Sequence, residues 1–108
     1  MAIDWGDVAK QVEAAVGGIL GKDWSTAYSG ASAQIAALIQ IGQSIEQNAA
    51  AMSADDYKSL QLMEQRAIEG VLQTYQSITI IAAEQAAAAA WNVVAQALKS
   101  ACGFPFIP

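Results

Sequence analysis

The distribution of proline is the feature that most restricts what this chain can fold into. Its only two prolines, Pro105 and Pro108, lie in the last four residues, so no proline ring bars any upstream residue from a helix. Strand patterns are nearly absent, and the one β-branched run, Ile78–Ile81, lies between strong helix formers and is interpreted as buried helix. The sequence therefore predicts an all-α, oligomeric protein of long antiparallel helices in a bundle or hairpin, with helical content above about 75%.

Capping residues and apolar periodicity place the first two helices of a single domain, residues 1–108. Asp4 is the predicted N-cap of a helix over residues 5–20, and Asp23 that of a second helix over residues 24–51. Apolar or small positions in the second helix alternate spacings of four and three residues over four heptads, which predicts a coiled-coil seam. The seam consists of Trp24, Tyr28, Ala31, Ile35, Leu38, Gly42, Ile45, Ala49 and Met52.

The third predicted helix is unusually long. Ser53 is its expected N-cap, and residues 54–101 contain no proline and one glycine, Gly70. A continuous helix of this length would extend about 70 Å, several times the usual length in globular proteins. The alternative is a break near Gly70, and we favour the continuous helix with a kink there. The remaining tail, residues 103–108, is predicted to be extended and apolar.

The charge balance of the chain limits the classes of molecule that it is expected to bind. The net charge is -5, and only 14% of the residues are charged, against roughly 25% in ordinary soluble domains. Five scattered basic residues cannot form the stripe that neutralises phosphates, so no nucleic-acid partner is expected. The N-terminal residues are acidic rather than basic, which argues against a Sec signal peptide and leaves a cytoplasmic location open. Cys102 is the only cysteine, which excludes a disulfide within the chain.

Long stretches of the predicted helices carry no charge. None occurs from Ser25 to Ile45, from Gly70 to Ala83, or from Gln85 to Leu98, where the polar residues are Gln, Ser, Thr and Asn. A solvated helix face normally carries Lys and Glu, whereas neutral amides pair across helices without the desolvation cost of a buried ion. Homo-oligomerisation is the expected reason, and an ordinary Ala/Gln-rich solvated surface is the alternative. The predicted interface residues are Ala31, Ile35, Leu38, Gln40, Gln43, Ile45, Ala49, Gln85, Asn92 and Gln96.

Catalytic chemistry is not expected. The chain has no histidine, which removes His-based triads and His-containing zinc or di-iron sites. The glutamates share no spacing motif, so no catalytic, cofactor or metal residues are predicted and the protein is expected not to be an enzyme. Glu84 is interpreted as a carboxylate at the rim of an oligomer, with a shared channel through a ring of subunits as the sharper alternative.

A membrane-active or channel-forming oligomer is the competing function. Ile78 to Leu98 is about 21 residues, long enough to span a bilayer. The segment contains Glu84 and several amides, and alanine offsets their cost only weakly, so a lone span is disfavoured. An oligomer could still bury these polar groups and present the Ile, Val and Leu side chains to lipid.

Two stretches resemble a known class of proteins. Ser29–Ala37 and Ile45–Ala51 are similar in texture to the small Ala/Gln-rich helical virion proteins of tailed phages, of the head-interior or ejection class. The resemblance implies a non-enzymatic, oligomeric structural protein that contacts other structural proteins and is remodelled into a channel during genome delivery.

The seam of the second helix generates a direct prediction. If Leu38 faces a neighbouring helix, Leu38→Ala should lower the free energy of unfolding by about 2 to 5 kcal/mol, because it removes buried methyl groups and leaves a cavity. Thermal or denaturant unfolding measures this difference. A change near zero would place the seam on the surface.

Overall fold

The computed structural model of the protein describes residues 3–102. Helices account for 89% of them and none lies in a strand, so the all-α prediction and the predicted helical content are confirmed. The described chain forms four α-helices: α1 Trp5–Leu20, α2 Trp24–Asn48, α3 Ala54–Leu72 and α4 Ile80–Cys102. The predicted extended tail, residues 103–108, lies outside the described residues.

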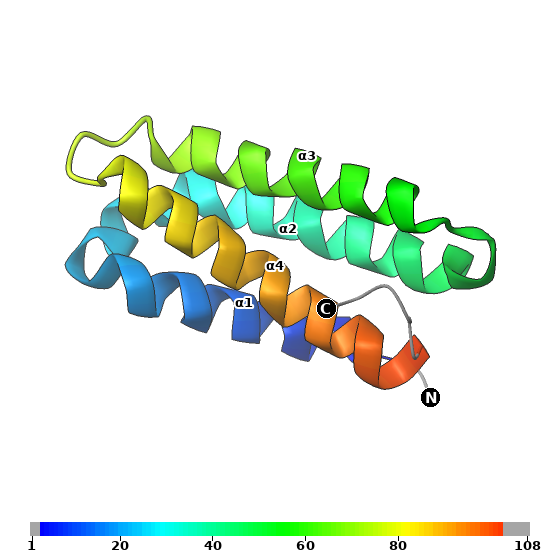
Figure 1. Ribbon diagram of the computed structural model, residues 1–108. Helices are drawn as coiled ribbons and strands as arrows, with labels where there is room; N and C mark the ends of the chain where they lie inside the picture. The colour runs from blue at the N-terminus through cyan, green and yellow to red at the C-terminus, as the bar shows by residue number, and fades with distance from the viewer. Residues whose placement is uncertain (1–2, 103–108) are drawn as a thin grey trace.

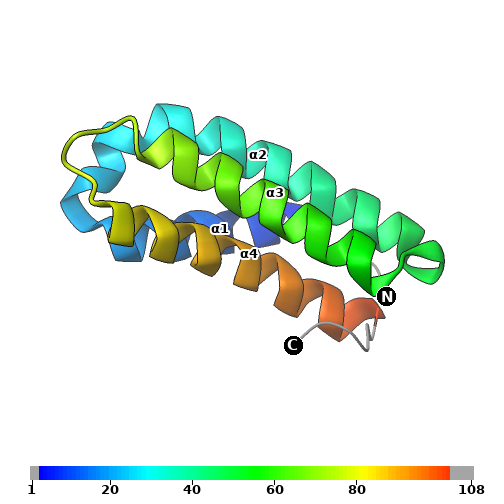
Figure 2. The same cartoon turned by 45° about the horizontal axis from the view of Figure 1, so that its top comes forward.

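The four helices lie side by side, and successive helices run in opposite directions (Figure 1). Their packing measures 41 × 25 × 20 Å along its principal axes. α4 contacts the other three helices, most extensively α1 and α3, and α2 contacts α1 and α3 as well (Figure 2). α2 and α4 therefore meet across the core, and each exposes the side that faces away from the other.

The cap of α1 forms as predicted, and the cap of α2 does not. Asp4 Oδ1 accepts a hydrogen bond of 3.1 Å from the Asp7 N–H, and α1 ends where Gly21 adopts a φ of 58°, which glycine tolerates. Asp23 occupies the predicted N-cap position of α2, but its side chain makes no capping hydrogen bond. A 3-10 turn, Gly21–Asp23, carries the chain directly into α2, and the Trp24 N–H bonds the Gly21 carbonyl instead.

The C-terminal end of α2 and the start of α3 follow the capping rules. The last turn of the predicted second helix tightens into a 3-10 segment, Ala49–Ala51. Ser53 then begins α3 with a complete capping box: its Oγ accepts from the Asp56 N–H at 3.1 Å, and Asp56 Oδ2 accepts from the Ser53 N–H at 3.4 Å.

The continuous helix over residues 54–101 is a wrong prediction. The chain leaves the helix after Leu72 and re-enters at Ile80, and Gly70 stays inside α3. Hydroxyl side chains stabilise the break: Thr74 Oγ1 donates to the Val71 carbonyl at 2.7 Å, and Thr79 Oγ1 accepts from the Ala82 N–H at 3.0 Å as the cap of α4. Doubling back lets α3 and α4 bury their apolar faces on one core, which a single rod of about 70 Å could not do.

The β-branched run beside this break is also not the buried helix that was predicted. Ile78 is buried in the connection, whereas Ile80 and Ile81 begin α4 with 64% and 67% of their surfaces exposed. The Thr79 cap fixes the start of α4 so that both isoleucines fall in its first turn, outside the core.

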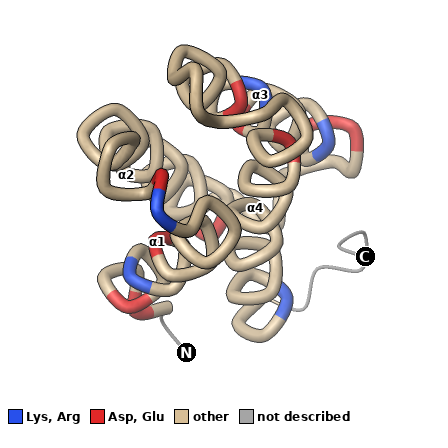
Figure 3. Tube along the Cα trace, turned by 90° about the vertical axis from the view of Figure 1, so that its left-hand side faces the viewer, with Lys and Arg blue, Asp and Glu red and all other residues tan. Residues whose placement is uncertain are grey.

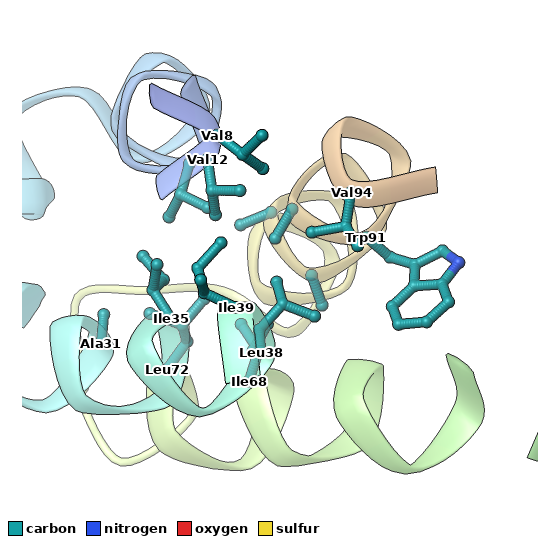
Figure 4. Close-up of a cluster of buried hydrophobic side chains, with 14 of the residues drawn as sticks. Val8, Val12, Ala31, Ile35, Leu38, Ile39, Ile68, Leu72, Trp91 and Val94 are labelled. Carbon is teal, nitrogen blue, oxygen red and sulfur yellow. The ribbon is translucent and has the colours of Figure 1, made fainter. Parts of the chain in front are cut away.

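The seam of α2 packs in the core of its own chain. Ala31, Ile35, Leu38 and Ile45 are buried, and Ile39, which lies off the seam, widens the buried face. Figure 4 shows four of these α2 side chains, Ala31, Ile35, Leu38 and Ile39, in one cluster with side chains of the three remaining helices: Val8 and Val12 of α1, Ile68 and Leu72 of α3, and Val94 of α4. The prediction that the seam faces neighbouring helices is confirmed for these residues, whereas Tyr28 of the predicted seam is exposed.

A close approach between α1 and α2 fixes their relative position. The Trp5 ring lies over Gly42, where a Cβ atom would be only 2.5 Å from Cζ3 of the indole. The Trp5 Nε1–H donates to Glu46 Oε1 at 2.8 Å, and the Ile3 N–H donates to Glu46 Oε2 at 3.2 Å. The only charged side chain of α2 is thus engaged within the chain, in charge-assisted hydrogen bonds.

Gly42 should therefore tolerate no side chain. Gly42→Ala is expected to destabilise the protein by about 1–3 kcal/mol, because the rigid, buried indole must shift to admit a methyl group. Gly18→Ala is the matched control, since Gly18 is in α1 with nothing within 4 Å of its Cβ position. That change should stabilise by roughly 0.5–1 kcal/mol through helix propensity alone. Equal effects of the two changes on denaturant unfolding would contradict the close approach.

Candidate functional site

The charged side chains are distributed unevenly over the helices. α2 carries only Glu46 and α4 only Glu84 and Lys99, whereas α1 and α3 carry most of the remaining charges. Figure 3 shows red and blue segments along α1 and α3 and long uncoloured stretches of α2 and α4. The uncharged faces of α2 and α4 lie on opposite sides of the molecule, because these helices pack against each other across the core.

The outer side of α4 forms a continuous exposed row. We call this row the α4 face: Ile81, Gln85, Ala88, Asn92 and Gln96, all exposed. Spacings of three and four residues keep these side chains on one side of a helix. Exposed Lys99 extends the row at its C-terminal end, and exposed Glu84 flanks it near the N-terminal end. The side chains in the middle of the face, Ala88 and Asn92, are small and uncharged.

Two shallow grooves flank the α4 face. The groove between α3 and α4 has a volume of about 430 Å³ and is lined by Gln61, Gln65, Ala88, Ala89, Trp91, Asn92 and Ala95. The groove between α1 and α4 has a volume of about 360 Å³ and is lined by Val8, Gln11, Asn92, Val93, Gln96, Ala97 and Ser100. No lining residue of either groove is charged, so both present amides and small apolar side chains.

An aromatic pair supports the α3–α4 groove. The buried Trp91 ring packs on Tyr57 of α3 with 5.5 Å between ring centroids and 59° between planes. Burial raises the pKa of the Tyr57 phenol, and a hydrogen bond with Trp91 partly opposes that rise. The pair holds α3 and α4 at a fixed distance beneath the groove.

The structure divides the ten predicted interface residues into two sets. Ala31, Ile35, Leu38 and Ile45 are buried within the chain and Ala49 is half-buried against the same core. Their contacts are therefore with helices of the same chain. The five amides are all exposed: Gln40 and Gln43 on α2, and Gln85, Asn92 and Gln96 on α4.

The α4 amides are brought together with side chains that sequence reasoning missed. Asn92 lines both grooves and Gln96 lines the α1–α4 groove, whereas Gln85 lies on the same row outside either lining. Gln11, Gln61 and Gln65 complete the linings from the charged helices α1 and α3. The spacing of Gln61 and Gln65, i to i+4 on one helix face, was the available signal.

The titratable groups outside this face offer little chemistry. Within residues 3–102, no three His, Cys, Asp or Glu side chains are placed to hold a metal ion. Cys102 is half-buried, and burial, together with the nearby Glu46 carboxylate, raises the pKa of its thiol. A thiol with a raised pKa is a poor nucleophile at neutral pH.

Across residues 3–102, no helix is both long and apolar enough to cross a bilayer.

Comparison of the chain with protein-family models, with curated proteins and with solved structures finds no match.

Among residues 3–102, Glu64 of α3 is the one carboxylate with an unsatisfied buried oxygen. Its Oε1 is buried without a hydrogen-bond partner, and burial raises the pKa of the carboxyl. A raised folded-state pKa means that the stability contributed by this group is fully present below its unfolded pKa. That contribution is lost as the pH rises through the folded pKa.

Glu64→Gln should therefore melt at a higher temperature than the parent protein at pH 7. The gap should close below pH 4.5, the ordinary pKa of this group, where Glu64 is protonated in both states. Calorimetry over this pH range measures the gap. Glu69→Gln, on the same helix, removes the same charge as a control, and an identical gap in both variants would assign the effect to net charge instead.

Proposed function

We propose that this chain is a non-enzymatic structural protein that assembles with copies of itself through the α4 face. The observation that supports the proposal is a neutral exposed row, bordered by two uncharged grooves, on a helix with charges only near its ends. A monomer gains nothing by excluding Lys and Glu from such a surface, since those residues keep proteins soluble.

Packing against another helix suits the chemistry of this face. An amide that leaves water can pair with an amide or backbone group opposite, whereas an unpaired charge there would cost several kcal/mol. Ala88 in the row and Ala89 beside it have short side chains, so the backbone of a second helix can approach closely. Ile81 adds an exposed apolar side chain, which a partner would remove from water.

The opposite face, on α2, is the weaker candidate for the same role. It also presents exposed amides, Gln40 and Gln43, among alanines and serines. The α4 face is favoured because two grooves border it and can receive the flanking side chains of a partner. One such assembly would be part of a phage particle, and this suggestion rests only on the compositional resemblance to phage virion proteins.

A pair of matched variants tests the proposal. Gln96→Glu puts a carboxylate on the α4 face and should weaken assembly by about tenfold or more, because a charge must then be buried. Gln43→Glu adds the same charge on the α2 face and should leave assembly unchanged. Size-exclusion chromatography with light scattering over a range of concentrations gives the assembled fraction.

Each contrary result has a distinct meaning. A wild-type protein that stays monomeric up to millimolar concentration would overturn the proposed self-assembly. Loss of assembly in Gln43→Glu but not in Gln96→Glu would move the contact to α2. Circular dichroism of both variants should show unchanged helix content, since both positions are exposed.

A further inference from the structure

The two charges of α4 are placed almost symmetrically about Asn92. At 1.5 Å per residue, Glu84 lies about 12 Å before Asn92 along the helix axis and Lys99 about 10.5 Å after it. Both side chains are exposed, and no other residue of α4 is charged. A negative and a positive charge therefore stand at nearly equal distances on either side of one exposed amide.

We propose that a second copy of the chain binds with its α4 antiparallel to the first, about a two-fold axis that passes beside Asn92. This inference rests on the proposed self-assembly and specifies its geometry. The axis sets Glu84 of each copy opposite Lys99 of the other, so the same attraction forms at both ends of the contact. A two-fold contact of this kind uses one patch twice and closes on itself as a dimer.

Charge complementarity selects this orientation over the parallel one. A parallel pair in register would put Glu84 beside Glu84 and Lys99 beside Lys99, with repulsion at both ends. A contact between the α4 face and the α2 helix offers Glu84 and Lys99 no free opposite charge on that helix, because its only charge is Glu46, which already binds Trp5. Of these three arrangements, the antiparallel pair of α4 helices is the one that sets both Glu84 and Lys99 against opposite charges.

The residues of the α4 face fit the same arrangement. Asn92 meets Asn92 of the second copy at the axis, where each amide has both a donor and an acceptor to offer. Gln96 comes to lie over Ala88 of the second copy, so a long side chain opposes a small one. Ile81 approaches the Cys102 end of the opposite helix, which covers its exposed surface.

A charge-swap series tests the orientation. Glu84→Lys alone places two like pairs across the axis, as does Lys99→Glu alone. Each single change should weaken the dimer by roughly tenfold, since two symmetric pairs change from attraction to repulsion. The double variant Glu84→Lys/Lys99→Glu restores both attractions and should recover the dimerisation constant of the wild type. Sedimentation equilibrium at low salt measures the constant, and raising the salt should shrink all the differences.

A cysteine placed at the axis gives a second, independent readout. In a Cys102→Ser background, Asn92→Cys should form a symmetric disulfide-linked dimer with oxidised glutathione. Gln43→Cys on α2 in the same background should form no disulfide-linked dimer under the same conditions. The crosslink requires proximity of the two copies and does not depend on charge.

The outcomes separate this geometry from self-assembly itself. A wild-type monomer would defeat both proposals. A wild-type oligomer whose single variants and double variant are equally weakened, or which crosslinks through Gln43→Cys and not Asn92→Cys, would retain self-assembly and overturn the antiparallel contact. Recovery in the double variant together with the Asn92→Cys crosslink is the expected result.

Discussion

The distance between the helices is set by small side chains, and the rest of the structure depends on it. The buried side of α4 is built largely from alanine: Ala83, Ala86, Ala87, Ala90 and Ala95. Alanine loses no side-chain entropy on burial and is the best helix former, so close packing costs α4 little. Each alanine buries little area, however, and the larger side chains of the other three helices must fill the space against it. α2 likewise has a small residue, Gly42, where the Trp5 ring approaches its backbone closely.

The uncharged outer faces are linked to this packing. A small-residue core lets α2 and α4 contact each other between α1 and α3, so each keeps only one outward side. The carboxylate of α2 binds the Trp5 indole at one end of the helix, and α4 holds its two charges near its ends. Glutamine, serine and alanine remain for the outward positions. The mean hydropathy of +0.30 thus comes from alanine both in the core and on the surface. Within residues 3–102, no helix is long and apolar enough to span a bilayer.

Local signals in the sequence predicted those parts of the fold that local contacts determine. The capping box of Ser53 and Asp56, the cap at Asp4 and the heptad seam of α2 each involve residues within one or two turns of one another. The break after Leu72 was predicted only as the alternative near Gly70, and the continuous helix was favoured because the connecting segment contains neither proline nor glycine. Threonine hydroxyls form it, and the competing helix is excluded by the need of α3 and α4 to share a core, which is a tertiary constraint. The amides of α4 were identified from their lack of charged neighbours, whereas Gln61 and Gln65 were hidden among the charges of α3.

A neutral face can bind another helix, but it cannot by itself choose how. Alanines and amides repeated at helical spacing offer similar contacts at several registers and in both directions, so attraction alone would permit an ensemble of pairings. Orientation requires groups whose mispairing costs free energy. In coiled coils, one buried asparagine and a few flanking charges meet that need. On α4, Asn92 stands in the middle of the neutral row, with Glu84 towards one end and Lys99 towards the other. In the proposed dimer, a shift by one helical turn would move Glu84 and Lys99 of the two copies apart and set Asn92 against Ala88. Asn92, Glu84 and Lys99 would therefore oppose a change of register between the two helices, and the neutral surface between them would supply the contact area.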